Sequence, residues 1–118
     1  MAKYEKIALL FPGQGSQYPG MGKELYENFT CVRDIYEKAS RILGYDLTQQ
    51  CIGKPIFGKK LVHKRDLNET VYTQPAVLTT SYACYKAMEE TCRQNGVKLD
   101  VALLAGHSLG EYTALLVS

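Results

Sequence analysis

The sequence predicts an α/β fold in which helices flank a parallel pair of strands. Two short apolar runs, residues 7–11 and 101–105, have the length expected of strands buried on both faces of a sheet. Helical periodicity fills two segments between these runs. Because strands that are joined by a helical crossover are usually parallel neighbours, we expect the two runs to pair in one sheet.

The first strand ends at Pro12-Gly13, and a glycine-rich loop without apolar periodicity follows it. Helical spacing starts near residue 22, and Gly44 is the expected helix stop. After a short apolar group around residues 25–29, one helix face is predicted to carry apolar side chains at spacings of 3, 4 and 3: Val32, Ile35, Ala39 and Ile42.

A second helix is predicted to open at Thr73-Gln74-Pro75, with Thr73 or Gln74 as the cap, and to end at Asn95-Gly96. Residues 45–70, which lie between the two helical regions, show no clear element. The core face of the second helix is expected to carry Leu78, Tyr82, Tyr85, Met88 and Cys92.

The composition excludes several functional classes. The chain has 118 residues, the size of one domain, and its formal net charge of +2 is too balanced for a nucleic-acid-binding protein. The four cysteines form no CxxC pair and only two histidines are present, so neither a zinc site nor a disulfide framework is expected. No apolar run near the N-terminus approaches the length of a membrane span, and no signal peptide is recognisable, so we expect a soluble cytoplasmic protein.

The most informative stretch is Gly106-His107-Ser108-Leu109-Gly110, which lies between an apolar run and a second one. A G-x-S-x-G pattern between a strand and a helix is typical of a nucleophile elbow, where a strained turn exposes the serine hydroxyl. We therefore predict Ser108 as the nucleophile. The Leu109 backbone N–H and the helix dipole are expected to stabilise an oxyanion. An inert serine in a glycine-bracketed turn is the alternative.

A second loop, residues 11–17, follows the first strand. If the strands are parallel neighbours, their carboxyl ends lie together, which is where sites form in open α/β sheets. Gln14 would then face Ser108 and offer a second backbone N–H, although a glycine-rich turn without catalytic meaning is the alternative. His107 is expected to support the site rather than act as general base, because adjacent side chains at a strand end diverge.

Three segments occur in a fixed order: Phe11-Pro12-Gly13-Gln14-Gly15-Ser16-Gln17, Tyr72-Thr73-Gln74-Pro75-Ala76 and Gly106-His107-Ser108-Leu109-Gly110-Glu111-Tyr112. Together they resemble the three N-terminal motifs of the malonyl-CoA:acyl-carrier-protein transacylase family, which includes the acyltransferase domains of fatty-acid and polyketide synthases. The similarity runs from about residue 6 to the last residue. Three ordered motifs are far more specific than G-x-S-x-G alone.

The resemblance implies a ping-pong acyl transfer. Ser108 would take the acyl group from malonyl-CoA or a related acyl-CoA and pass it to the phosphopantetheine thiol of an acyl carrier protein. Gln14 and Leu109 match the backbone donors of the family's oxyanion hole, and Gln74 matches a glutamine that lines the site, where we also place His107. Coenzyme A enters only as the substrate thioester, and no bound cofactor or metal is implied. The implied fold is an α/β-hydrolase-like core with a ferredoxin-like subdomain inserted later in the chain.

The sequence departs from the family downstream of Ser108. The general-base histidine and the carboxylate-binding arginine of the family have no counterpart in this chain, and the ferredoxin-like subdomain is also absent. We therefore expect residues 1–118 to be the N-terminal part of a single acyltransferase catalytic domain, with little or no activity alone. A partial core exposes apolar surface, which favours self-association or association with the remainder of the polypeptide. The start at Met1 favours a free-standing parent enzyme.

Two other functions fit parts of the pattern. A serine esterase or thioesterase would use the same elbow, but the Gln14 and Gln74 motifs weigh against it. A non-catalytic module that binds an acidic carrier protein would use a local basic cluster. A solvent-exposed surface loop without a binding role is the alternative interpretation of this cluster. That cluster consists of Lys54, Lys59, Lys60, His63, Lys64 and Arg65.

Overall fold

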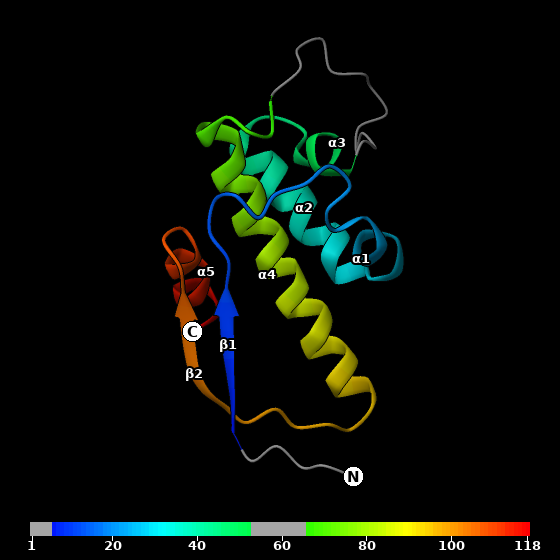
Figure 1. Cartoon of the computed structure of the whole chain (residues 1–118). Helices are drawn as coiled ribbons and strands as arrows, with labels where there is room; N and C mark the ends of the chain where they lie inside the picture. Colours follow the sequence, from blue (N-terminus) through cyan, green and yellow to red (C-terminus); the bar gives the residue numbers. More distant parts are fainter. Residues whose placement is uncertain (1–5, 53–65) are drawn as a thin grey trace.

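The computed structural model describes residues 6–52 and 66–118, so the predicted basic cluster lies outside the described residues. Figure 1 shows the described part as a group of helices beside a small sheet. In chain order the elements are β1 (Ile7–Phe11), α1 (Lys23–Asn28), α2 (Thr30–Leu43), α3 (Leu47–Ile52), α4 (Thr70–Gln94), β2 (Val101–Gly106) and α5 (Gly110–Val117).

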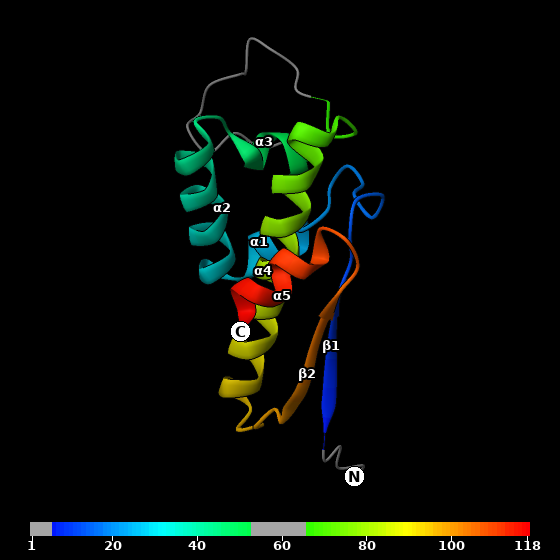
Figure 2. The same ribbon diagram turned by 90° about the vertical axis from the view of Figure 1, so that its left-hand side faces the viewer.

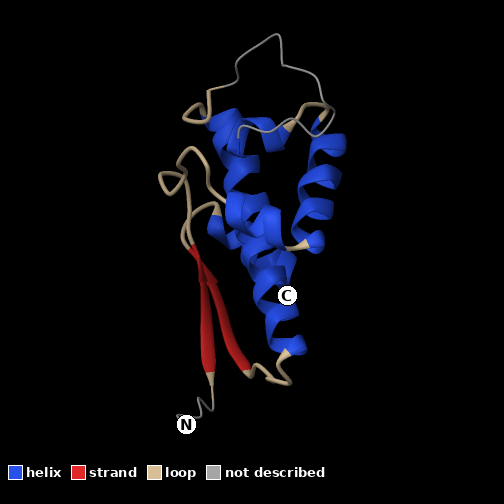
Figure 3. Ribbon diagram, turned by 90° about the vertical axis from the view of Figure 1, so that its right-hand side faces the viewer, coloured by secondary structure: helices blue, strands red, loops and turns tan. Residues whose placement is uncertain are grey.

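The two predicted strands form a parallel pair. Ile7 is opposite Val101 and Phe11 is opposite Gly106, with one irregularity after Ile7. The described helices lie on one side of this pair, as the two side views show (Figures 2 and 3). The α/β class, the positions of both strands and their parallel pairing are therefore confirmed.

The prediction that the strands are buried on both faces is wrong for the described residues. Phe11 is buried, but Leu10 is 75% exposed and Leu103 is 57% exposed. Neighbouring side chains of a strand point to opposite faces, and the described helices cover only one of them. The other face of the pair is an open apolar surface, of the kind expected for a partial core.

Helix α2 ends where the sequence predicts, because Gly44 adopts a left-handed φ of 80° that closes the helix. Its predicted apolar face is confirmed in part. Val32 is buried, and Ile35 and Ala39 pack against the core, but Ile42 is 76% exposed. Two residues outside the predicted face, Tyr36 and Ser40, are also buried. Tyr36 can be buried because its hydroxyl lies 2.5 Å from the hydroxyl of Thr80 on α4, which satisfies its polar tip.

Helix α4 begins at Thr70, earlier than predicted, so that Pro75 lies inside it. Thr73 is not the cap: its buried hydroxyl bonds the carbonyl oxygens of Leu67 and Glu69. The predicted core face of large side chains is also wrong. The buried positions carry small or β-branched residues, which allow α2 to pack close to α4: Thr73, Ala76, Val77, Thr79, Ala83 and Ala87.

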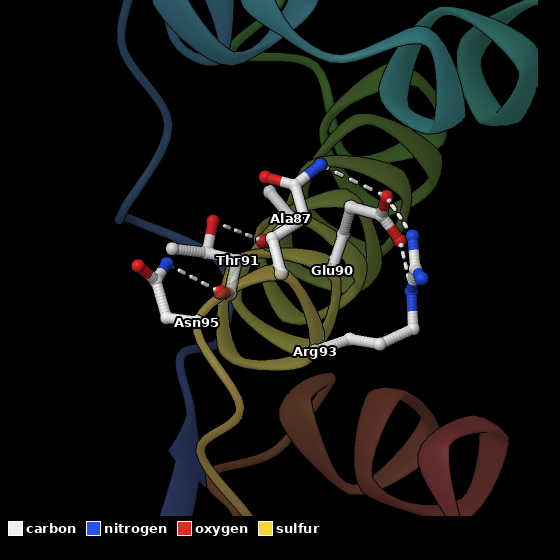
Figure 4. Close-up of polar contacts among 6 residues, drawn as sticks. Ala87, Glu90, Thr91, Arg93 and Asn95 are labelled. Carbon is white, nitrogen blue, oxygen red and sulfur yellow. Dashed lines mark hydrogen bonds and ion pairs between the residues drawn. The ribbon is translucent and has the colours of Figure 1, made fainter.

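The end of α4 is confirmed at Asn95-Gly96. The hydroxyl of Thr91 donates to the Ala87 carbonyl at 2.8 Å, and the side-chain amide of Asn95 donates to the Thr91 carbonyl at 2.8 Å (Figure 4). Arg93 pairs with Glu90 at 2.6 Å on the same turns. Gly96 then takes a φ of 65° and turns the chain toward β2.

Helix α3 was not predicted, because it spans only six residues. The Asp46 carboxylate accepts the backbone N–H of Gln49 at 3.1 Å, which caps its start. Leu47 and Cys51 then pack into the core, and burial raises the pKa of the Cys51 thiol to about 12. Within residues 6–52 and 66–118, none of the helices combines the length and apolar character required to cross a bilayer.

Candidate active site

The two loops that follow the strands are in direct contact. The His107 backbone N–H donates to the Phe11 carbonyl at 3.1 Å, which continues the ladder one residue beyond β2. A Cβ atom on Gly13 would lie 2.5 Å from the His107 carbonyl oxygen, so only glycine allows this approach. The prediction that both strand ends meet at one edge of the sheet is therefore confirmed.

Ser108 occupies the apex of the turn between β2 and α5. Its φ is 53°, a left-handed value that no other described non-glycine residue shares. Such a conformation costs about 1–2 kcal/mol and tends to occur at functional sites. The residue is exposed, so its hydroxyl is accessible from solvent.

Gly106 and Gly110 make this turn possible. A Cβ atom on Gly106 would lie 2.0 Å from the backbone carbon of Gly110, and a Cβ atom on Gly110 would lie 2.1 Å from the Phe11 carbonyl oxygen. Both contacts are far shorter than any real Cβ contact. The G-x-S-x-G spacing is thus a steric requirement of packing the start of α5 onto the ends of both strands.

The Leu109 backbone N–H lies at the start of α5. The next two amides have partners: Gly110 donates to the His107 carbonyl at 2.9 Å, and Glu111 donates to the Ser108 carbonyl at 3.0 Å. The Leu109 N–H has no acceptor within the part of the chain that the structure describes. Its side chain is buried, which holds the start of the helix in place.

Gln14 lies in the exposed glycine-rich loop, next to the contact between Gly13 and His107. Its backbone N–H likewise has no acceptor among the described residues. Its side-chain amide donates to the Thr70 hydroxyl at 2.9 Å, and the neighbouring Gln17 donates to the Asn68 side-chain oxygen at 3.1 Å. Thr70 and Asn68 carry no sequence signal that would place them beside this loop, because more than 50 residues separate them from it.

The two other predicted site residues, Gln74 and His107, come from α4 and from the turn after β2. Gln74 is exposed on α4, one turn after Thr70, so it shares the helix face that Gln14 reaches. His107 is exposed, and its backbone N–H and carbonyl bond Phe11 and Gly110. Within the described ranges, no hydrogen bond joins the His107 ring to the Ser108 hydroxyl.

A groove of about 540 Å³ lies between the loop and α4. Pro12 and Ser16 of the glycine-rich loop and Cys84 of α4 are among its lining residues, whereas Ser108 is not. The described residues thus provide an exposed hydroxyl and two unengaged N–H groups at one edge of the sheet. Within residues 6–52 and 66–118, no cluster of three or more His, Cys, Asp or Glu side chains is arranged to hold a metal.

Comparison with known proteins gives consistent matches. Residues 8–118 match the family described as the acyl transferase domain. The malonyl CoA-acyl carrier protein transacylase of Salmonella typhimurium is 43% identical over 113 residues, which cover 93% of this chain but 31% of the relative. The chain therefore spans about a third of the length of such relatives.

Solved structures show the same relation. The malonyl-CoA:acyl carrier protein transacylase of Helicobacter pylori aligns with a TM-score of 0.75 and 39% identity, over 94% of this chain and 32% of that one. A structure of a type II polyketide-synthase acyl-carrier protein in complex with its malonyl-transacylase aligns with a TM-score of 0.69 and 40% identity. That alignment covers 96% of this chain and 32% of the solved chain.

Proposed function

We propose that this chain forms the N-terminal part of the catalytic domain of a malonyl-CoA:acyl-carrier-protein transacylase. The chain belongs to the acyl transferase domain family, which residues 8–118 match. The observation that carries the proposal is the left-handed Ser108 between β2 and α5, beside the loop that contains Gln14. The names of the relatives support malonyl-CoA as acyl donor and an acyl carrier protein as acceptor. Free coenzyme A is then a product.

In the first half-reaction, the Ser108 oxygen attacks the thioester carbonyl carbon, while a base removes the hydroxyl proton. The tetrahedral intermediate collapses as the carbon–sulfur bond breaks, and the proton passes to the leaving thiolate of coenzyme A. An ester on Ser108 remains. In the second half-reaction, the base takes the proton of the carrier's phosphopantetheine thiol, and the sulfur attacks the ester carbonyl carbon. The bond between that carbon and the Ser108 oxygen then breaks, the proton passes to this oxygen to restore the hydroxyl, and the acyl group leaves as a new thioester.

The Gln14 and Leu109 N–H groups bind the oxyanion in both half-reactions. Neither N–H has an acceptor within residues 6–52 and 66–118, so neither must break a hydrogen bond before it donates to the oxyanion. Backbone donors of this kind contribute through preorganisation, because they need no reorientation during the reaction. Gln74 lines the same edge from α4, as its position one turn beyond Thr70 supports.

The base is supplied from outside the chain, by a histidine of the remaining polypeptide, and an arginine there binds the malonyl carboxylate. We do not assign the base to His107, because side chains of adjacent residues diverge and its Nδ1 lies beside Gly13, 3.5 Å from the position of an added Cβ atom there.

The test is the fate of the malonyl group in the full polypeptide. Labelled malonyl-CoA is incubated with the enzyme, with and without a carrier protein that bears phosphopantetheine. We expect the label to appear on the carrier thiol, with little free malonate. Release of malonate at the same rate with and without carrier would contradict the proposal and would identify a thioesterase.

The open sheet face is expected to make the isolated chain associate. Leu10 and Leu103 present apolar surface there, which the remainder of the polypeptide would cover. By light scattering after size exclusion, we expect the 118-residue chain to exceed its monomer mass of 13.2 kDa. The double variant Leu10→Lys/Leu103→Lys should be monomeric, whereas Ile42→Lys, at an exposed apolar site on α2, should still associate. A monomeric wild-type chain would contradict this expectation.

A further inference from the structure

We propose that Thr70 and Asn68 are positioning residues that hold the Gln14 loop in the geometry required for oxyanion binding. The inference rests on the proposed function, since it assigns how one of the two donors is fixed. The Leu109 donor is fixed by the start of α5, in which the two following amides are already bonded. Gln14 has no helix or strand to hold it, so its position depends on other contacts.

The loop has little rigidity of its own. No helix or strand is assigned between Phe11 and Lys23, and Gly15 adopts a φ of 109° that favours glycine. Its internal bonds join Ser16 to the Gly13 carbonyl at 2.8 Å and the Gly15 amide to the Gln17 side chain at 2.8 Å. These bonds shape the loop locally. The Gly20 backbone N–H donates to the Cys51 carbonyl at 2.7 Å, which connects the far end of the loop to α3 but not the part around Gln14.

Two amide side chains connect the part of the loop around Gln14 to the start of α4. Gln14 donates to the Thr70 hydroxyl at 2.9 Å, and Gln17 donates to the Asn68 side-chain oxygen at 3.1 Å. The Gln17 side chain accepts the Gly15 amide with its oxygen, so the same residue links the loop backbone to Asn68. The two bonds span 56 and 51 residues of sequence, and they fix both sides of the Gly15 turn to one short segment.

The receiving segment, residues 66–70, is itself anchored. The Asn68 backbone N–H donates to the Asp66 carboxylate at 2.8 Å, and the Glu69 backbone N–H donates to the Asp66 carbonyl at 3.0 Å. The buried Thr73 hydroxyl bonds the Leu67 carbonyl, and Leu67 packs into the core. Residues 66–70 are therefore held in place by their own contacts, and the bonds from Gln14 and Gln17 position the loop relative to them.

The test uses the full polypeptide and a pair of variants that break one bond from its two sides. Thr70→Val keeps the β-branched shape but removes the hydroxyl, and Gln14→Met keeps the length but removes the donor. Thr70→Ser restores the acceptor, and Thr91→Val makes the matched change at an exposed threonine far along α4. The measured quantities are kcat, KM for malonyl-CoA and the melting temperature.

We expect Thr70→Val and Gln14→Met each to lower kcat by about 10-fold, because a misplaced donor weakens transition-state stabilisation. KM and the melting temperature should not change, Thr70→Ser should recover kcat, and Thr91→Val should behave as wild type. The double variant Thr70→Val/Gln14→Met should have the same kcat as each single variant, since each of the three proteins lacks the hydrogen bond between Gln14 and Thr70. Losses that multiply in the double variant, or a KM effect without a kcat effect, would contradict positioning.

Ser108→Ala separates this inference from the proposed function. If Ser108→Ala is inactive while Thr70→Val and Gln14→Met match wild type, the positioning role is wrong and the transacylase proposal stands. If Ser108→Ala transfers malonyl groups at the wild-type rate, the proposed function fails, and the positioning inference fails with it.

Discussion

Replacing Ser108 with alanine is expected to lower malonyl transfer by the full polypeptide by at least about 10⁴-fold, because the covalent route needs this hydroxyl. The substitution removes one oxygen from an exposed position at which the left-handed backbone is already set by neighbouring glycines. We therefore expect the melting temperature to remain at the wild-type value. The measurement is the initial rate of labelled-malonyl transfer to the carrier.

Ser118→Ala is the matched control. Ser118 is another exposed serine ten residues downstream, and its hydroxyl donates to the Leu115 carbonyl at 2.7 Å. We expect this variant to keep the wild-type rate. Transfer by Ser108→Ala within tenfold of wild type would place the nucleophile elsewhere in the polypeptide.

Replacing Gly110 with alanine is expected to destabilise the fold by about 3 kcal/mol, at the upper end of overpacking costs. The added Cβ would lie 2.1 Å from the Phe11 carbonyl oxygen and 2.8 Å from the Phe11 carbonyl carbon. Both are backbone atoms of β1, which cannot move aside as a flexible side chain can. Relief of the contact must shift the start of α5, so the Leu109 donor moves and transfer activity falls as well.

Gly96→Ala distinguishes this steric effect from the general cost of replacing glycine. Gly96 has a φ of 65° but no atom within 4 Å of an added Cβ, so its substitution should cost about 1 kcal/mol. Urea unfolding followed by circular dichroism compares the two variants with wild type. Equal midpoints for Gly110→Ala and Gly96→Ala would contradict the close packing of α5 onto β1.

The local backbone was predictable where short-range chemistry determines it. Continuous apolar runs gave both strands, and Gly44 and Gly96 ended their helices because left-handed positions favour glycine. The faces of the helices were less predictable. Ile42 has the right spacing for a core position, but the described fold places nothing over it, whereas Tyr36 is buried because Thr80 offers a distant partner.

Helix α4 is a second case in which the spacing of apolar residues does not predict which side chains are buried. Its pattern of large side chains suggested a core face, yet the buried positions include Ala76, Ala83 and Ala87, since close contact with α2 requires small residues. Thr73 has the chemistry of a cap but bonds carbonyls from within the helix. Such choices depend on what packs opposite, which the local sequence does not contain.

The candidate site divides in the same way. The turn at Ser108 was predictable, because the strand, the two glycines and the following helix are contiguous in the chain. The platform formed by Asn68 and Thr70 was not, because its contacts with Gln17 and Gln14 cross more than 50 residues and involve ordinary polar side chains. Only the fold brings them together.

The most direct test of the central claim is the intact mass of the full polypeptide, measured before and after brief exposure to malonyl-CoA without carrier protein. The account predicts a gain of about 86 Da, the mass of one malonyl group in a covalent ester. Peptide mapping should place it on Ser108, and addition of carrier protein should remove it. No gain, or a gain that persists in Ser108→Ala, would contradict a Ser108-linked acyl intermediate.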